Sequence, residues 1–167
     1  MVAKFILQEV WRIGCDWDHV IPEDIQKAWK NWINQLSSLR NLHNPRWIQS
    51  INQPPKKREL HVFSDTSSRG YGAVVYIRLS YEDGKSEVAF VLAKARGAPV
   101  NCQSIPRLEL QGAVLGLRLA TIVTNFLNLN PLLTTFWTDS HLAFWTVLQW
   151  INSTICRFKV FVSNRIG

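Results

Sequence analysis

Apolar residues in the first quarter of the chain recur every three or four positions, which is the spacing of one face of an α-helix. A series between residues 5 and 13 predicts a short helix that ends near Gly14. A longer series between residues 25 and 39 begins after Pro22 and has two acidic residues in its first turn. Proline and acids at this end are typical of a helix start, so a second, amphipathic helix is predicted.

The stripe of this second helix carries Trp29 and Trp32, which allow two interpretations. Paired tryptophans can stack on nucleic-acid bases, but tryptophans on an apolar helix face are more often buried, and we expect them in a core. Prolines and basic residues break the pattern between residues 44 and 58. We therefore place a boundary there, with a helical connector at 1–58 and the main domain at 59–167.

From residue 60 onward the pattern changes to short runs rich in valine, isoleucine and aromatic residues, which favour strands. Strands are predicted at Leu60–Asp65, Gly72–Tyr81 and Glu87–Ala93, with a hairpin turn at Glu82–Lys85. Short connections between them predict an antiparallel meander. The following segment, Lys94–Ser104, is expected to be a loop.

Pro106 starts a long apolar helix with small residues on one stripe, which allow close approach to a sheet. The stripe consists of Glu109, Gly112, Ala113, Gly116 and Ala120. Polar residues interrupt the apolar run between residues 108 and 129, so we expect no membrane span.

The next strand, Thr134–Asp139, follows a helical crossover and is therefore expected to lie parallel to Leu60–Asp65. Residues 141–151 are predicted to form a helix and residues 158–166 a further one. The predicted fold class is α/β, a mixed sheet of antiparallel strands 3-2-1 plus parallel strand 4, with helices packed on it.

Composition narrows the function classes. A net charge of +7 favours a polyanionic partner such as nucleic acid, although it also fits a solubilising surface. The N-terminal residues lack the pattern of a signal peptide, and we expect an intracellular protein, cytoplasmic or nuclear. Cys15, Cys102 and Cys156 have no zinc-site spacing and suggest no disulfide framework.

Two strands end in the same pattern of aromatic, hydroxyl and aspartate: Phe63-Ser64-Asp65 and Trp137-Thr138-Asp139. Adjacent parallel strands lie about 4.8 Å apart, so the two carboxylates are expected to meet, with Glu109 joining from the helix. Three close carboxylates repel unless a cation neutralises them, and oxygen ligands suit Mg²⁺ or Mn²⁺. Two such ions support phosphodiester hydrolysis. The alternative is that each aspartate caps a turn.

Five segments in order resemble the ribonuclease H region of BEL/Pao-type retrotransposon polyproteins: 63–65, 70–76, 93–96, 104–110 and 137–140. Residues 147–151 and 157–165 continue the resemblance, and 17–32 resemble the connector that follows the reverse transcriptase. The run Ser-Ile-Pro-Arg-Leu-Glu-Leu between the aspartate motifs is its most specific part.

The resemblance implies a metal-dependent enzyme that cuts the RNA strand of an RNA–DNA hybrid, with Asp65, Glu109 and Asp139 as catalytic metal ligands for Mg²⁺ or Mn²⁺, two ions if active. It also implies reverse transcriptase and integrase portions of a parent polyprotein as partners. The expected phosphate contacts are Lys94, Arg96 and Arg107. The alternative is that they are only solvent-exposed residues of a loop.

Two departures from the family pattern leave activity open. No Asp or Glu follows Asp139, so the family's fourth acid is absent, and we expect a C-terminally truncated domain without its last strand and helix. Residues 141–146 look like an insertion of about one helical turn. A non-catalytic remnant that binds nucleic acid or is only structural is therefore an alternative.

A second alternative is an aspartic-type peptidase, because such regions also carry a Pao retrotransposon peptidase label. Asp65-Thr66-Ser67 resembles the Asp-Thr-Gly of retroviral proteases. Ser67 stands where that motif has glycine, which disfavours this interpretation.

Overall fold

A computed structural model describes residues 1–45, 48–100, 104–130, 133–140 and 157–160. Two helices come first, α1 (Val2–Ile13) and α2 (Glu23–Leu36), followed by a short 3-10 helix, η1 (Ser37–Asn41). α1 ends as predicted, because Gly14 adopts a left-handed conformation (φ 74°) that glycine tolerates without steric cost.

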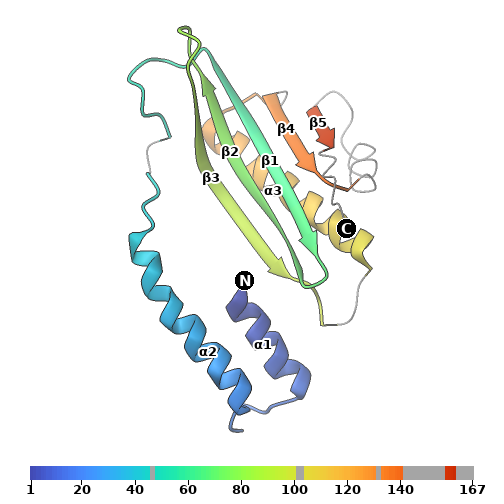
Figure 1. Cartoon of the computed structure of the whole chain (residues 1–167). Helices are drawn as coiled ribbons and strands as arrows, with labels where there is room; N and C mark the ends of the chain where they lie inside the picture. Colours follow the sequence, from blue (N-terminus) through green and yellow to red (C-terminus); the bar gives the residue numbers. More distant parts are fainter. Residues whose placement is uncertain (46–47, 101–103, 131–132, 141–156, 161–167) are drawn as a thin grey trace, which may run out of the picture.

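The centre of the molecule is a five-stranded mixed sheet (Figure 1). Its strands are β1 (Lys57–Ser67), β2 (Gly70–Ser80), β3 (Ser86–Gly97), β4 (Thr134–Thr138) and β5 (Arg157–Val160). In the order β3-β2-β1-β4-β5, the first three strands are antiparallel, and β4 and β5 run parallel to β1. The predicted fold class and the parallel pairing of β1 with β4 are confirmed.

Two expectations about the C-terminal part are wrong. The last strand is present, since residues 157–160 pair with β4, and residues 158–160 are strand where a helix was predicted. Four residues are too few for apolar periodicity to distinguish a helix from a strand, and the pairing with β4 identifies this segment as a strand. The helix predicted at 141–151, the insertion at 141–146, Cys102 and Cys156 lie outside the described residues.

β3 is longer than predicted, because it continues through Lys94 and Arg96 to Gly97. These positions pair with β2, Lys94 opposite Ala73 and Arg96 opposite Tyr71. The expected loop at Lys94–Ser104 therefore begins only after Gly97. Both basic residues consequently sit on a rigid strand at the edge of the sheet.

One long helix, α3 (Ile105–Leu127), covers one face of the sheet. The small-residue stripe works as predicted: Gly112, Ala113, Gly116 and Ala120 are all buried. A Cβ atom on Gly116 would lie 3.1 Å from Val62 Cγ1, which shows how closely helix and strand approach. α3 is long and apolar enough to cross a membrane, yet its packing on the sheet is that of a core helix.

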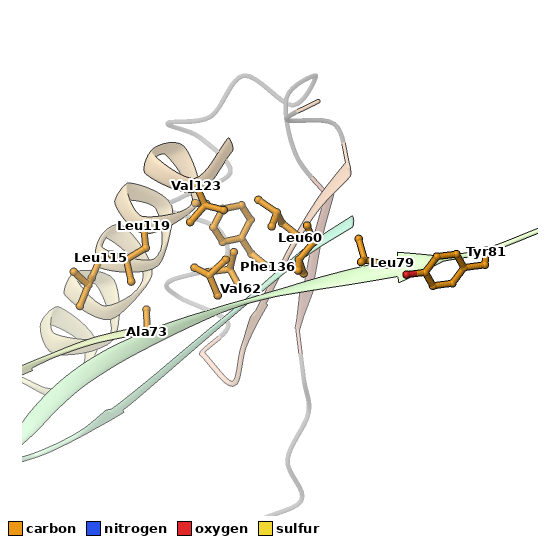
Figure 2. Packing of buried hydrophobic residues seen from close by; sticks show 12 residues of the cluster. Leu60, Val62, Ala73, Leu79, Tyr81, Leu115, Leu119, Val123 and Phe136 are labelled. Atoms are coloured by element: carbon orange, nitrogen blue, oxygen red, sulfur yellow. The ribbon is translucent and has the colours of Figure 1, made fainter. Parts of the chain in front are cut away.

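The core lies between α3 and the sheet (Figure 2). Alternate residues of β1 and β2 face the helix, which is the two-residue period of a half-covered sheet. The buried cluster comprises Leu60, Val62, Ala73, Val75, Ile77, Leu79, Tyr81, Leu115, Leu119, Ala120, Val123 and Phe136.

α2 does not bury its apolar stripe, so the expectation that its tryptophans lie in a core is wrong. Trp29 is 37% exposed, and its ring lies 4.9 Å from that of Trp32 in a tilted pair. Within the described part of the helix, Ile25 is the buried residue. α2 packs against α1 and η1 and stands apart from the sheet (Figure 1).

Candidate active site

The two repeated motifs meet at the carboxyl ends of β1 and β4. These strands pair in parallel register up to Phe63 and Trp137, whose rings stack 5.7 Å apart with planes only 7° from parallel. Continuing this register by two residues aligns Asp65 with Asp139. The sequence pattern therefore predicted the parallel neighbours correctly. Asp139 directly follows β4, whereas β1 continues past the predicted end to Ser67, so Asp65 lies two residues before the end of its strand.

Asp65 and Asp139 line one open groove with a volume of about 980 Å³. Phe63, Trp137 and Lys94 also line it, and most of its surface is apolar. Both carboxylates are exposed, and Asp65 Oδ1 accepts a hydrogen bond from the Thr66 backbone N–H at 2.8 Å. Two acids at the end of an apolar groove can engage a ligand that is partly flat and partly charged.

Glu109 lies in the first turns of α3 and is only partly exposed. Ser140, the buried residue directly after Asp139, donates its hydroxyl to Glu109 Oε2 at 2.6 Å. This bond ties the start of α3 to the end of β4. It was not predicted, although Ser140 belongs to the motif that drew attention to Asp139.

The structure does not bring the three acids into one group. Among residues 1–45, 48–100, 104–130, 133–140 and 157–160, no cluster of three acidic, histidine or cysteine side chains has metal-binding geometry. Strand alternation is the reason: Val62 and Thr66 face α3, so Asp65 lies on the other face, away from the helix that carries Glu109.

That other face carries an array of rings that sequence reasoning did not single out. His61, Phe63, Tyr76, Phe90 and Trp137 are linked by ring contacts of 5.7 to 6.0 Å. Trp137 Nε1 also donates a hydrogen bond to His61 Nδ1 at 3.1 Å. The available signal was His61 and Phe63, which stand two positions apart on β1 and therefore share a face. The array forms an aromatic surface beside the aspartates, in which Trp137 stacks on Phe63 and Tyr76 meets its neighbours edge to face.

The three predicted phosphate contacts, Lys94, Arg96 and Arg107, are all exposed. Lys94 lines the groove itself, Arg96 follows two residues later on the same strand, and Arg107 lies in the first turn of α3. Cations at the edge of a strand and at the start of a helix can contact a polyanion without the desolvation cost of a buried charge.

Ionisable groups with shifted pKa values lie at the opposite end of the sheet. Hydrogen bonds lower the pKa of Glu87, and the bond from Ser50 has a larger effect than the bond from Tyr81. Burial, followed by the hydrogen bond to Glu87, raises the pKa of Tyr81 to about 12. On β1, a hydrogen bond from Lys57 lowers the pKa of Glu59. These contacts fasten the connector and the strand ends, and they lie outside the groove.

The donor chemistry at the groove fits a hard divalent cation. Asp65, Glu109 and Asp139 offer carboxylate oxygens, which Mg²⁺ and Mn²⁺ prefer over imidazole or thiolate. Their present arrangement supplies at most two of these acids to one face, as described above. The residues therefore match the ion in type, while the full ligand set is not assembled.

Sheet order and acid placement together define the class: an α/β domain with a ribonuclease H-like sheet and carboxylates at the ends of its two central parallel strands. The family model described as Pao retrotransposon-like RNaseH-like domain matches residues 1–140. The chain belongs to this family.

Three solved structures show weak likeness. RNase H1 from the halophilic archaeon Halobacterium salinarum NRC-1 is 10% identical with a TM-score of 0.35, over 62% of this chain and 85% of that one. LC11-RNase H1 in complex with an RNA/DNA hybrid is 11% identical with a TM-score of 0.37, over 63% and 85%. Foamy viral protease-reverse transcriptase in complex with dsDNA is 11% identical with a TM-score of 0.45, over 95% of this chain and 33% of that one.

These TM-scores are too low to support a conclusion about function. No curated protein matches the chain.

Proposed function

We propose that this domain hydrolyses the RNA strand of RNA–DNA hybrids in a divalent metal-dependent reaction. The observation that carries the proposal is the alignment of Asp65 with Asp139 at the ends of β1 and β4 in one groove. Family membership supports the same reaction class. Within a retroelement polyprotein, reverse transcriptase and integrase portions are the natural partners of such a domain.

Each residue has a defined role in this proposal. Asp65, Glu109 and Asp139 are the residues that would hold Mg²⁺ or Mn²⁺ ions, and bound ions would supply an activated water and charge stabilisation for the displaced oxygen. Lys94, Arg96 and Arg107 hold phosphates without regard to sequence. Specificity for the RNA strand requires recognition of its 2′-hydroxyl groups.

The test is cleavage of an end-labelled RNA–DNA hybrid in Mg²⁺ and in Mn²⁺. Asp65→Asn and Glu109→Gln each keep the side-chain shape and remove a charged ligand, so both should abolish cleavage. Asp18→Asn and Glu23→Gln are matched controls, since these exposed acids lie in the connector and should leave cleavage unchanged. Full cleavage by Asp65→Asn or by Glu109→Gln would refute the proposed roles.

A second candidate is a non-catalytic domain that binds nucleic acid. The absence of a three-acid cluster among the described residues favours it. It predicts hybrid binding without cleavage, even at high Mn²⁺ concentration. Metal-dependent cleavage that Glu109→Gln removes would exclude it.

The peptidase alternative gains no support. Asp65 lies within β1 of a mixed α/β sheet, and the matched family is described as RNaseH-like. The same Asp65→Asn variant tests it: a pepstatin-sensitive peptidase activity lost in this variant would be required.

A further inference from the structure

The N-terminal helix α1 belongs to the candidate site, although the sequence assigned it to a separate connector. Met1 and Phe5 line the groove that also contains Asp65 and Asp139. α1 thus forms part of the wall of the groove. Whatever occupies the groove beside the aspartates lies next to this helix.

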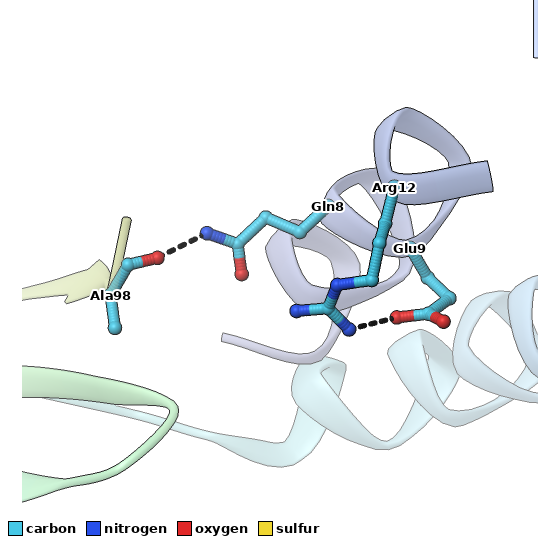
Figure 3. Close-up of polar contacts among 4 residues, drawn as sticks. All are labelled: Gln8, Glu9, Arg12 and Ala98. Carbon is cyan, nitrogen blue, oxygen red and sulfur yellow. Dashed lines mark hydrogen bonds and ion pairs between the residues drawn. The ribbon is translucent and has the colours of Figure 1, made fainter. Parts of the chain in front are cut away.

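Three contacts hold α1 against the end of the sheet. Gln8 Nε2 donates to the Ala98 carbonyl at 2.6 Å (Figure 3), and Lys4 Nζ donates to the Ala95 carbonyl at 3.1 Å. The Arg69 guanidinium lies 4.4 Å from the centre of the Phe5 ring, a cation–π distance. These contacts span α1, β3 and the turn after β1.

Glycines make this close approach possible. A Cβ atom on Gly97 would lie 2.9 Å from Gln8 Nε2, and one on Gly70 would lie 3.0 Å from the Met1 side chain. The same Cβ on Gly70 would lie 2.6 Å from the Arg96 carbonyl. Gly70 and Gly97 therefore leave room for the side chains of Met1 and Gln8 where the helix lies against the sheet.

The two cations of α1 differ in their surroundings. Arg12 is paired with Glu9 at 2.6 Å (Figure 3). Lys4 instead contacts the carbonyl of Ala95, which stands in β3 between Lys94 and Arg96. Its ammonium therefore lies at the backbone of the strand segment that carries these two cations. An exposed ammonium bonded to one carbonyl keeps donors for a further acceptor.

We propose that Lys4 is an additional phosphate contact, so that α1 and β3 together form one basic rim for the nucleic-acid backbone. The ligand chemistry is a phosphodiester backbone, and the contact is independent of sequence. This inference rests on the proposed nucleic-acid substrate. It adds a residue and an element that motif reasoning left outside the site.

Binding without metal separates this inference from catalysis. The affinity of the full chain for a fluorescent RNA–DNA hybrid is measured by anisotropy in EDTA, between 50 and 200 mM salt. Loss of one phosphate contact lowers the slope of log K against log salt by about 0.9. Raising the salt concentration fourfold weakens binding by both chains. The fold-loss of affinity should be smaller for Lys4→Ala than for the parent chain, by a factor of about 3.5.

Two further variants complete the design. Lys30→Ala removes the same charge from exposed α2 and should leave the slope unchanged, whereas Lys4→Arg should restore the slope of the parent chain. Equal slopes for Lys4→Ala and Lys30→Ala would overturn the inference, as would absence of hybrid binding by the parent chain. Cleavage measured separately reports on the proposed function, so either idea can fail alone.

Discussion

Gly112 is the point where α3 approaches the acid-bearing end of β1, and its replacement by alanine tests the packing of the site. A Cβ atom there would lie 2.9 Å from Thr66 Oγ1 and 3.8 Å from the Asp65 carbonyl. Thr66 is β-branched and stiff, so its hydroxyl cannot move aside freely. The same substitution removes a glycine from the interior of a helix.

The two effects oppose each other. Replacing a helix-interior glycine by alanine stabilises by about 1 kcal/mol, whereas overpacking a filled site costs about 1 to 3 kcal/mol. Gly112→Ala should therefore destabilise by about 0 to 2 kcal/mol. In a Thr66→Ala background the obstructing hydroxyl is absent, and the substitution should stabilise by up to about 1 kcal/mol.

Urea unfolding of the four chains in this double-mutant cycle gives the coupling between the two positions. A change of sign between backgrounds, with coupling of at least about 1 kcal/mol, is the expected result. Stabilisation by Gly112→Ala in both backgrounds would refute the close contact, because helix propensity alone would then explain the data. Equal destabilisation in both backgrounds would show that Thr66 is not the obstacle.

Substitutions at three further positions have defined outcomes. Phe136→Ala should cost about 3 to 5 kcal/mol in urea unfolding, since Phe136 is 6% exposed in the core and truncation leaves a cavity. Asn128→Gly should be tolerated and Asn128→Ala should cost about 1 kcal/mol or more by thermal unfolding, because position 128 has φ 49°. Glu87→Gln should destabilise at pH 7 but progressively less below pH 4.5, since folding lowers the pKa of Glu87 and its stabilising charge is lost as pH falls through that lowered value. Equal destabilisation at pH 7 and pH 3 would contradict the role of the Glu87 carboxylate.

Local signals account for the parts of the fold that the sequence predicts well. Gly84, with φ 81°, allows the hairpin turn between β2 and β3, and Asn128 ends α3 in a left-handed conformation. The parallel pairing of β1 with β4 follows from the helical crossover between them. Each of these features depends on a few adjacent residues or on a general rule of topology.

Features that depend on distant partners were less predictable. Periodicity shows that α2 is a helix with an apolar stripe. It does not show whether another element packs on that stripe, and in the structure the Trp29 side chain is exposed. Phe158 and Val160 alternate as in a strand, yet only pairing with β4 identifies β5. The contact of α1 with Ala95 and Ala98 joins residues about 90 positions apart, beyond any local pattern.

The sequence proposes the residues of the candidate site, and the structure gives their arrangement. The motifs correctly indicated that Asp65 and Asp139 belong to adjacent parallel strands, although β1 continues two residues beyond Asp65. They did not show that Asp65 faces away from α3 and Glu109. That information was present in the alternation of Leu60 and Val62, whose burial under α3 assigns the odd-numbered positions of β1 to the other face.

The most direct test of the proposed activity is strand-specific cleavage by the full chain. An RNA–DNA hybrid labelled on either strand is incubated with excess protein in Mn²⁺, beside the Asp139→Asn variant. RNA fragments from the parent chain, with the DNA strand intact and no product from Asp139→Asn, are the predicted result. Hybrid binding with both strands uncut by the parent chain, or equal cleavage by Asp139→Asn, would contradict the assignment of this groove as an active site.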